Sequence, residues 1–579
     1  MTSTGALPDA SAETYVTPTK RAAFSASAEA GPSRARPAGP SPAYSSRRHS
    51  LYGVEDRVVI DPGSRIWKVG FSGEPDPRAV FWTQSSPDTE GSEAWTLDLA
   101  RLHGCRGDRK EAERLIATRC VRLAREAFVQ HLMTDSKTRK VVVLENTLLP
   151  TTVKEQIAAA LFDNLKVPSV SFTPSCLLAL AACGRISGLV VDIGWLETTI
   201  TPVYCSRPLV HLARSTPSAG RALHDRLRLL LHHHATYLPS PTSMSNLDRQ
   251  PQPVPYELLS DRVVERVLTE GCFVGPVLLD PLMGTDDAPD MSEETDNVRL
   301  ASMLRDRYGD STTATDLSFR LEMSGVTNGL GPGILRVPGW VRERAAEVLL
   351  EEVMDDERDG LPEAILQCIA KLPVDLRPTL ISSLLVVGGT ACLPGLIPRL
   401  RVSLLRLLLP PPSQPETDYP IDSAAWRRVD RDAWRRRHLE PFKPLYGLSG
   451  RLAILNDPAP LDVDGDGDAD LAGGGAGGKA PRWTPALTAW VGGSLAGALK
   501  TGAPELTRET YDALFAHSIE RGEAWLAAQA AAERDVAASV GVSVDDLRPG
   551  MARDGLQRKR GWKVGGEVVP DWTRGVRAG

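Results

Sequence analysis

Three short hydrophobic runs, each ending at an acidic residue or a glycine pair, constrain the fold of this chain more than any other feature. Arg57–Ile60 leads into Asp61-Pro62-Gly63-Ser64, Gly188–Gly194 has the sequence GLVVDIG, and Leu384–Thr390 has the sequence LLVVGGT. Such β-branched runs are typical of buried strands that enter tight turns. Patterns with helical periodicity separate them, at residues 154–165, 343–354 and 394–409. Strands that alternate with helices predict an α/β fold.

The first turn carries residues that suit a phosphate. It lies in the segment Arg57–Phe81, RVVIDPGSRIWKVGFSGEPDPRAVF. A strand, a Gly63-Ser64 turn and a returning strand point several backbone N–H groups into one concavity, which can hold a phosphate. Lys68 adds a positive charge, and Asp61 can face a hydrated Mg2+. On Gly63 and Ser64 alone, an ordinary β-hairpin is the preferred interpretation.

Two further strand ends change that preference. Asp192 follows a strand of the same character as the one before Asp61, so two acidic strand ends can oppose each other across a cleft. Gly388 and Gly389, followed by Thr390, end a third strand at which a backbone can approach a nucleotide closely. The three strand ends together indicate a nucleotide cleft far more specifically than any one of them.

Composition narrows the classes of function. The chain has 67 Lys and Arg against 73 Asp and Glu, a net charge of -6, so it has no general attraction for nucleic acid or an anionic membrane. Its eight cysteines include no C-x-x-C pair, which argues against a zinc site or a disulfide framework and fits the cytoplasm. It contains no run of about 18 apolar residues, so direct membrane insertion is not expected.

The chain is expected to hold one large folded domain, residues 53–579, after a disordered tail rich in Ser, Pro and Ala, residues 1–52. A transit peptide is the alternative for the tail, but its acidic residues argue against one. Three segments of polar, acidic or glycine-rich composition are predicted to be disordered insertions, near 235–258, 279–298 and 456–480.

The motifs carry a family resemblance. DPGSRIWKVGFSGEPDPRAVF resembles the first phosphate loop of actin, GLVVDIG the second, and LLVVGGTACLPGLIPRL the adenosine motif, while ALTAWVGGSLAGAL resembles actin's C-terminal Trp-x-Gly-Gly-Ser segment. The resemblance implies the duplicated two-lobed fold shared by actin, Hsp70 and sugar kinases, with ATP or ADP and Mg2+ between the lobes. By position it implies the nucleotide-site residues Asp61, Gly63, Ser64, Lys68, Asp192, Gly194, Gly388, Gly389 and Thr390, with Asp61 and Asp192 facing the metal through water.

Several positions depart from actin's pattern. Trp195 and Leu196 stand in the second loop where the pattern has Asp and Gly, and Ser175 stands where actin has the Gln that positions the attacking water. Arg65 replaces a second glycine in the first loop. Further departures lie at the adenosine end, at Leu268, Thr269 and Ala486. They predict weak or absent ATP hydrolysis and no catalytic residues, and leave open that no nucleotide binds.

Other stretches resemble the dynactin pointed-end class of actin-related proteins, called actin-related protein ten in fungi. They include residues 144–180, CFVG at 272–275, and Pro570-Asp571-Trp572. Subdomain 2, about residues 82–140, is shorter than in actin. The resemblance implies a cytoplasmic, cytoskeletal subunit that caps the pointed end of dynactin's short filament and supports dynein-driven transport along microtubules. Its partners would be the filament-forming actin-related protein and the other pointed-end subunits.

Two alternatives to that function stay open. One is an active actin-like ATPase or sugar kinase, for which Asp192 would have to act as a base or a metal ligand. The residues Ser175, Trp195 and Leu196 argue against it. The other is a nuclear actin-related protein of a chromatin-remodelling complex, since members of that class also lose catalytic residues.

Overall fold

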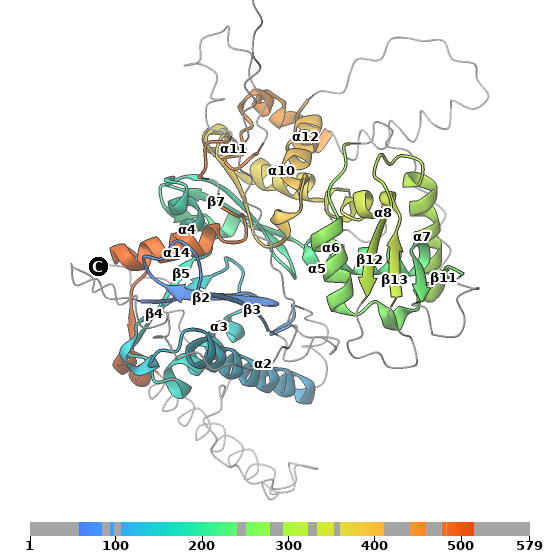
Figure 1. Cartoon of the computed structure of the whole chain (residues 1–579). Coiled ribbons are helices and arrows are strands. Elements are labelled where there is room, and N and C mark those ends of the chain that lie inside the picture. The colour runs from blue at the N-terminus through green and yellow to red at the C-terminus, as the bar shows by residue number, and fades with distance from the viewer. Residues whose placement is uncertain are drawn as a thin grey trace, which may run out of the picture. The chain divides into compact units, whose positions relative to one another are not determined.

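The computed structural model describes residues 57–83, 93–97, 106–239, 250–277, 293–321, 333–351, 359–409, 440–458, 478–481 and 483–514 (Figure 1). Every element below belongs to the unit Glu55–Gly579. The predicted tail, residues 1–52, lies outside the described residues, as does the Pro570-Asp571-Trp572 stretch.

The first sheet is built around the first hydrophobic run. Its six strands follow the order β15-β5-β4-β1-β2-β3. Strands β1 and β2 form an antiparallel hairpin, and β1 pairs in parallel with β4. The bounds are β1 Val58–Pro62, β2 Ile66–Phe71, β3 Ala79–Trp82, β4 Val141–Glu145, β5 Ser169–Pro174 and β15 Leu506–Thr507.

The second sheet repeats this arrangement with the other two runs. Strands β6 and β7 form an antiparallel hairpin, and β6 pairs in parallel with β14, as β1 does with β4. The strand order is β14-β6-β7-β8, with β9 also paired to β7. The bounds are β6 Gly188–Ile193, β7 Thr198–Tyr204, β8 Arg207–Pro208, β9 Arg214–Thr216 and β14 Leu384–Val387. The chain therefore contains one α/β unit twice.

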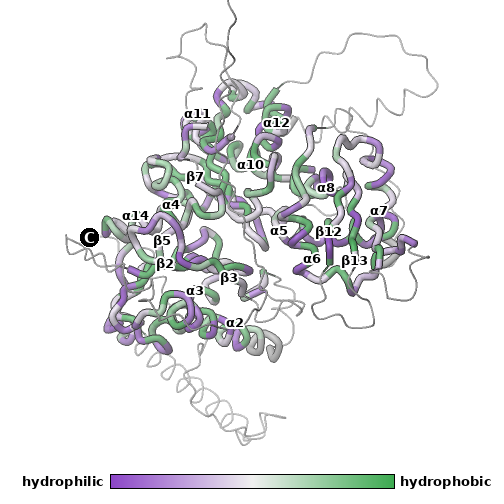
Figure 2. The backbone as a smooth tube through the Cα atoms, in the orientation of Figure 1, coloured by the Kyte–Doolittle hydropathy of each residue, from purple (hydrophilic) through white to green (hydrophobic). Residues whose placement is uncertain are grey.

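Helices cover the two sheets, because their apolar faces need a partner. In Figure 2 the segments α4 and α10 are largely green, that is hydrophobic. Helices α4 and α14 approach so closely that a Cβ on Gly492 would lie 1.9 Å from the carbonyl oxygen of Leu178. The bounds are α2 Arg106–Glu126, α3 Thr151–Ala159, α4 Ser175–Ala182, α10 Leu361–Lys371, α11 Arg377–Ile381, α12 Leu396–Leu408 and α14 Thr488–Leu499.

A third, antiparallel sheet has the order β11-β10-β13-β12. It packs with helices α5 to α8 in the larger hydrophobic core, to which Tyr237, Phe319 and Trp340 contribute. The bounds are α5 Gly220–His234, β10 Thr236–Pro239, β11 Gln252–Pro253, α6 Asp261–Gly271, α7 Glu293–Tyr308, β12 Leu317–Leu321, β13 Gly333–Val337, α8 Gly339–Arg344 and α9 Glu347–Leu350.

The ends of the three predicted insertions differ from that prediction. Residues 235–258 contribute β10 and β11, because Tyr237 is buried and pairs with the third sheet. The second insertion, 279–298, runs into α7 at Glu293. In the third, 456–480, the Asn456 amide exchanges two hydrogen bonds with the backbone of Val386 in β14. Residues 240–249, 278–292 and 459–477 lie outside the described residues.

Between β3 and β4 the described residues form α2, a π-helical turn at Ala127–His131 and a short 3-10 turn at Ser136–Thr138. This is the span, about 82–140, for which a shortened subdomain 2 was predicted, and the shortening stays a prediction. Among the described helices, none is both long enough and apolar enough to cross a lipid bilayer.

Candidate nucleotide cleft

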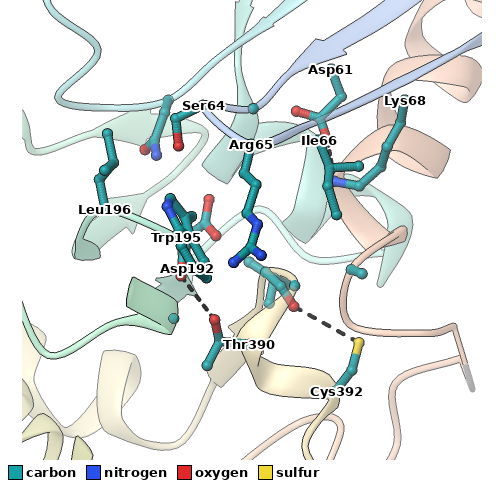
Figure 3. A pocket seen from close by; sticks show the side chains of 18 of the residues that line it. Asp61, Ser64, Arg65, Ile66, Lys68, Asp192, Trp195, Leu196, Thr390 and Cys392 are labelled. Atoms are coloured by element: carbon teal, nitrogen blue, oxygen red, sulfur yellow. Dashed lines mark hydrogen bonds and ion pairs between the residues drawn. The ribbon is translucent and has the colours of Figure 1, made fainter. Parts of the chain in front are cut away.

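All nine residues predicted for the nucleotide site line one pocket of about 490 Å³. They come from three places: the turn between β1 and β2, the turn between β6 and β7, and the chain that follows β14. Figure 3 shows side chains from these segments, among them Asp61, Trp195 and Thr390, around the pocket. The fold thus brings together residues that lie more than three hundred positions apart.

The two hairpin turns have the same backbone geometry. The N–H of Gly63 donates to the carbonyl oxygen of Ile66 over 3.1 Å, and the N–H of Gly194 donates to that of Glu197 over 3.1 Å. A Cβ on Gly63 would lie 2.4 Å from the Ile66 oxygen, and one on Gly194 would lie 2.9 Å from the Glu197 oxygen. The turns themselves therefore require both glycines, whether or not a phosphate binds.

Gly388, at the third strand end, is also required by packing. Its φ of +102° is one that side chains rarely adopt, and a Cβ would lie 2.3 Å from the Ile193 oxygen. The Thr390 hydroxyl donates to the carbonyl oxygen of Gly194 over 2.9 Å. By contrast, a Cβ on Gly389 would meet no atom within 4 Å. The third strand end is thus bonded directly to the second turn.

Two carboxylates share one ammonium group at the cleft. Lys68 Nζ lies 2.6 Å from Asp61 Oδ2, across the β1–β2 pair. Desolvation opposes the charge on Lys68, but the attraction and hydrogen bond of Asp61, helped by Asp192, raise its pKa. Desolvation, together with the nearby Asp61 charge, raises the pKa of Asp192 to about 6, although Lys68 acts in the opposite direction. The pKa of Asp192 is therefore shifted toward neutral pH.

Arg65 extends into the pocket beside Trp195 (Figure 3). Its guanidinium carbon lies 3.6 Å from the centre of the Trp195 ring and 5.1 Å from that of Trp82. One of its nitrogens lies 3.3 Å from Glu265 Oε2, on α6. Burial lowers the pKa of Arg65, while the charges of Glu265, Asp261 and Glu93 act against that shift. Arginine stays protonated in such surroundings, so a fixed cation occupies this part of the cleft.

The two bulky residues of the second turn are held by protein partners. The indole N–H of Trp195 donates to Glu93 Oε1 over 2.8 Å. Leu196 packs against the hydrophobic core of the first sheet. Sequence reasoning missed Glu93 and Glu265, which belong to no recognisable motif; their approach depends on how α6 and residues 93–97 fold back on the cleft.

The comparisons agree with the geometry. The family model described as Actin matches residues 54–263 and 335–425, more than half of the chain. The chain belongs to the actin family. A curated relative, "Actin-related protein 4" of Arabidopsis thaliana, is 25% identical over 396 residues, which are 61% of this chain and 86% of that protein. The match supports an actin-related protein, and the duplicated α/β units are the two lobes of the actin-like ATPase fold.

The positions that depart from actin's pattern line the same pocket as those that keep it. They are Arg65, Ser175, Trp195, Leu196, Leu268, Thr269 and Ala486. Actin-family proteins in general hold ATP or ADP with Mg2+ in this cleft. Asp61 and Asp192 fit a hydrated cation held through water, and the described residues contain no group of three or more His, Cys, Asp or Glu that could ligate one directly. Beside the two glycine turns, the side chains of Arg65 and Trp195 line the pocket and contact each other, where actin's pattern has Gly and Asp.

Proposed function

We propose that this actin-related protein is a non-catalytic structural subunit of a cytoskeletal assembly, a pseudo-ATPase rather than an enzyme. The observation that carries the proposal is the second turn. Where actin's pattern needs backbone that a phosphate can approach, Trp195 is hydrogen-bonded to Glu93 and Leu196 packs into a core. A tight grip on a nucleotide's phosphates would require both side chains to leave these partners.

The pocket also offers little for hydrolysis. Ser175, the first residue of α4, lines the pocket at the position of the Gln that orients the attacking water in actin. A serine hydroxyl sits on one carbon and reaches less far than a glutamine amide, so an attacking water would be poorly positioned. A protein with this cleft is better suited to holding a shape than to turning over ATP.

The finer proposal is that the protein caps the pointed end of dynactin's short actin-related filament and supports dynein-driven microtubule transport in the cytoplasm. Its support is the resemblance at residues 144–180 and 272–275, and the short span about 82–140. An end-capping subunit must keep one of the two surfaces that filament neighbours use and lose the other. Its partners would then be the filament-forming actin-related protein and the remaining pointed-end subunits, with no nucleic acid involved.

A nuclear subunit of a chromatin-remodelling complex is the second candidate. The match to Arabidopsis actin-related protein 4 covers 86% of that protein, so the likeness to actin-related proteins is not confined to the dynactin class. Loss of catalytic residues fits both candidates, since neither role requires hydrolysis. The partners decide between them.

Affinity purification of the full chain, followed by quantitative mass spectrometry, tests the proposal. We expect recovery of the filament-forming actin-related protein with other dynactin subunits, and impaired nuclear positioning when the gene is deleted. The matched control is tagged conventional actin from the same cells, because it corrects for proteins that bind any actin fold. Recovery of nucleosome remodellers without dynactin subunits would transfer the assignment to the second candidate.

A further inference from the structure

We propose that four side chains form a clasp that holds the cleft closed without a nucleotide. The clasp consists of Arg65 and Glu93 from the first lobe, and of Trp195 and Glu265 from the second. In the family pattern the nucleotide and its metal ion lie between the lobes. Here the Arg65 side chain supplies a positive charge between them, and Trp195 and Glu265 are its partners. The proposal concerns the isolated chain, so it does not depend on which complex the protein joins.

The first arm of the clasp runs from the first lobe to the second. Arg65 leaves the β1–β2 turn, lies over the Trp195 ring with its guanidinium carbon 3.6 Å from the ring centre, and pairs with Glu265 at 3.3 Å. The Arg65 side chain is 9% exposed and that of Glu265 is 24% exposed, so water screens the pair only in part. Cation–π contacts strengthen when the cation is desolvated in this way.

The second arm runs in the opposite direction. Trp195 leaves the β6–β7 turn and donates its indole N–H to Glu93 over 2.8 Å. Arg221, at the start of α5, lies 3.7 Å from the other oxygen of the same carboxylate. Glu93 is anchored on the first lobe, because the next residue, Ala94, donates its N–H to the Ser64 oxygen over 2.7 Å. Trp195, which belongs to the second lobe, is therefore held by two residues of the first lobe, Arg65 at its ring and Glu93 at its N–H.

The charges around Arg65 favour this clasp over an anion site. Glu265, Asp261 and Glu93 all act on Arg65, opposed by Arg228. An incoming phosphate would have to displace a carboxylate or sit among several, which costs Coulomb energy in a partly buried site. One Arg65 nitrogen, Nη1, is buried without a hydrogen-bond partner, and it is the atom through which a phosphate contact would be made if one formed. The experiment below separates the two roles.

Hydrogen–deuterium exchange on the purified full chain is the test. Arg65→Met removes the positive charge with little loss of side-chain volume. Arg65→Lys keeps the charge but replaces the planar guanidinium with an ammonium group. Without nucleotide we expect amide exchange at residues 193–197 and 261–268 to rise by about fivefold or more in Arg65→Met, and by less in Arg65→Lys. Glu265→Gln should act in the same direction. Arg266→Met is the control within α6, because Arg266 pairs with Glu270 and with the Arg320 carbonyl oxygen, outside the clasp, so its loss should leave exchange at residues 193–197 unchanged.

Two results would overturn the proposal. Unchanged exchange in both segments for Arg65→Met would mean that the arginine does not couple the lobes. A wild-type chain that binds Mg-ADP, together with a tenfold or greater loss of that binding in Arg65→Met, would make Arg65 a phosphate ligand instead. Neither readout involves dynactin or ATP turnover. A result that refutes the clasp therefore leaves the proposed function untouched, and a result that refutes the proposed function leaves the clasp untouched.

Discussion

The β1–β2 and β6–β7 turns have the same backbone geometry but different side chains. In each, an Asp is the last residue but one of the first strand, a Gly follows two residues later, and the N–H of that Gly donates to a carbonyl three residues on. Beyond that geometry they diverge: the first turn keeps Ser64 but adds Arg65, whereas the second carries Trp195 and Leu196. The two turns therefore share one backbone geometry and differ in the side chains beside it.

The glycines of a nucleotide-binding motif can be required by the fold itself, whether or not a nucleotide binds. Gly63 and Gly194 are needed by their turns, and Gly388 is needed by a close approach to Ile193, so substitution at any of them strains the fold. The backbone does not require glycine at positions 195 and 196, which are Trp195 and Leu196 in this chain. A glycine in a phosphate loop is therefore weaker evidence for nucleotide binding than the residues beside it.

The largest effect that this comparison predicts is on stability. Gly63→Ala should lower the free energy of unfolding by about 2–4 kcal/mol, and Gly194→Ala by about 1–2 kcal/mol, because the new methyl groups would crowd carbonyl oxygens. Gly389→Ala is the matched control and should change stability by no more than about 0.5 kcal/mol, since its Cβ would meet nothing within 4 Å. Chemical denaturation measures all three. Equal tolerance of alanine at Gly63 and Gly389 would contradict the shared backbone geometry.

The strand-and-turn units could be predicted from sequence because their causes are local. A buried strand is a run of β-branched residues, and a tight turn needs glycine at a fixed place, so the nine residues predicted for the site line one pocket. The helix predicted over 343–354 was less accurate: it is split into α8 and α9, with the helix interrupted at Ala345 and Ala346. Local patterns describe elements better than they describe where elements bend.

The contents of the cleft could not be predicted in the same way. Glu93 and Glu265 reach Trp195 and Arg65 through tertiary packing, and nothing in their neighbouring sequence marks either as a site residue. The ends of the segment 235–258 show the same limit. Their composition is that of a loop, yet β10 and β11 form there because β13 offers a partner strand. Pairing across long distances overrides local composition.

Removing the charge of Asp61 and removing that of Asp192 should change the stability of the protein in opposite directions. Asp61→Asn takes the partner from Lys68, and we expect a loss of stability of about 1–3 kcal/mol. Asp192 has a pKa raised from 3.8 to about 6, so its ionised form is the unfavourable one in the folded protein. Asp192→Asn should therefore stabilise the protein at pH 7.5 by about 3 kcal/mol, since each pKa unit is worth about 1.4 kcal/mol.

The stability difference between Asp192→Asn and the wild type should depend on pH. Because the folded pKa of Asp192 is raised, the folded state binds the proton more tightly than the unfolded state between pH 3.8 and about 6, and stability from this group rises as pH falls through that window. The advantage of Asp192→Asn over the wild type should thus shrink by about half between pH 7.5 and pH 5. Denaturant titrations of both proteins at each pH measure it. A constant difference across the range would contradict a shifted carboxylate at this position.

The smallest expected effect is on ATP turnover. Ser175→Gln restores the residue type that positions water in actin, but Trp195 and Leu196 would still occupy the second turn, so we expect no increase in phosphate release. The informative variant combines Ser175→Gln with Trp195→Asp and Leu196→Gly, since it returns both the water-positioning group and the bare backbone. Phosphate release from the wild type, the single variant and the combined variant is measured under identical Mg-ATP. A tenfold or greater rise in the rate of phosphate release in Ser175→Gln would show that Trp195 and Leu196 do not prevent hydrolysis. The difference between the two turns would then not explain a low ATPase rate.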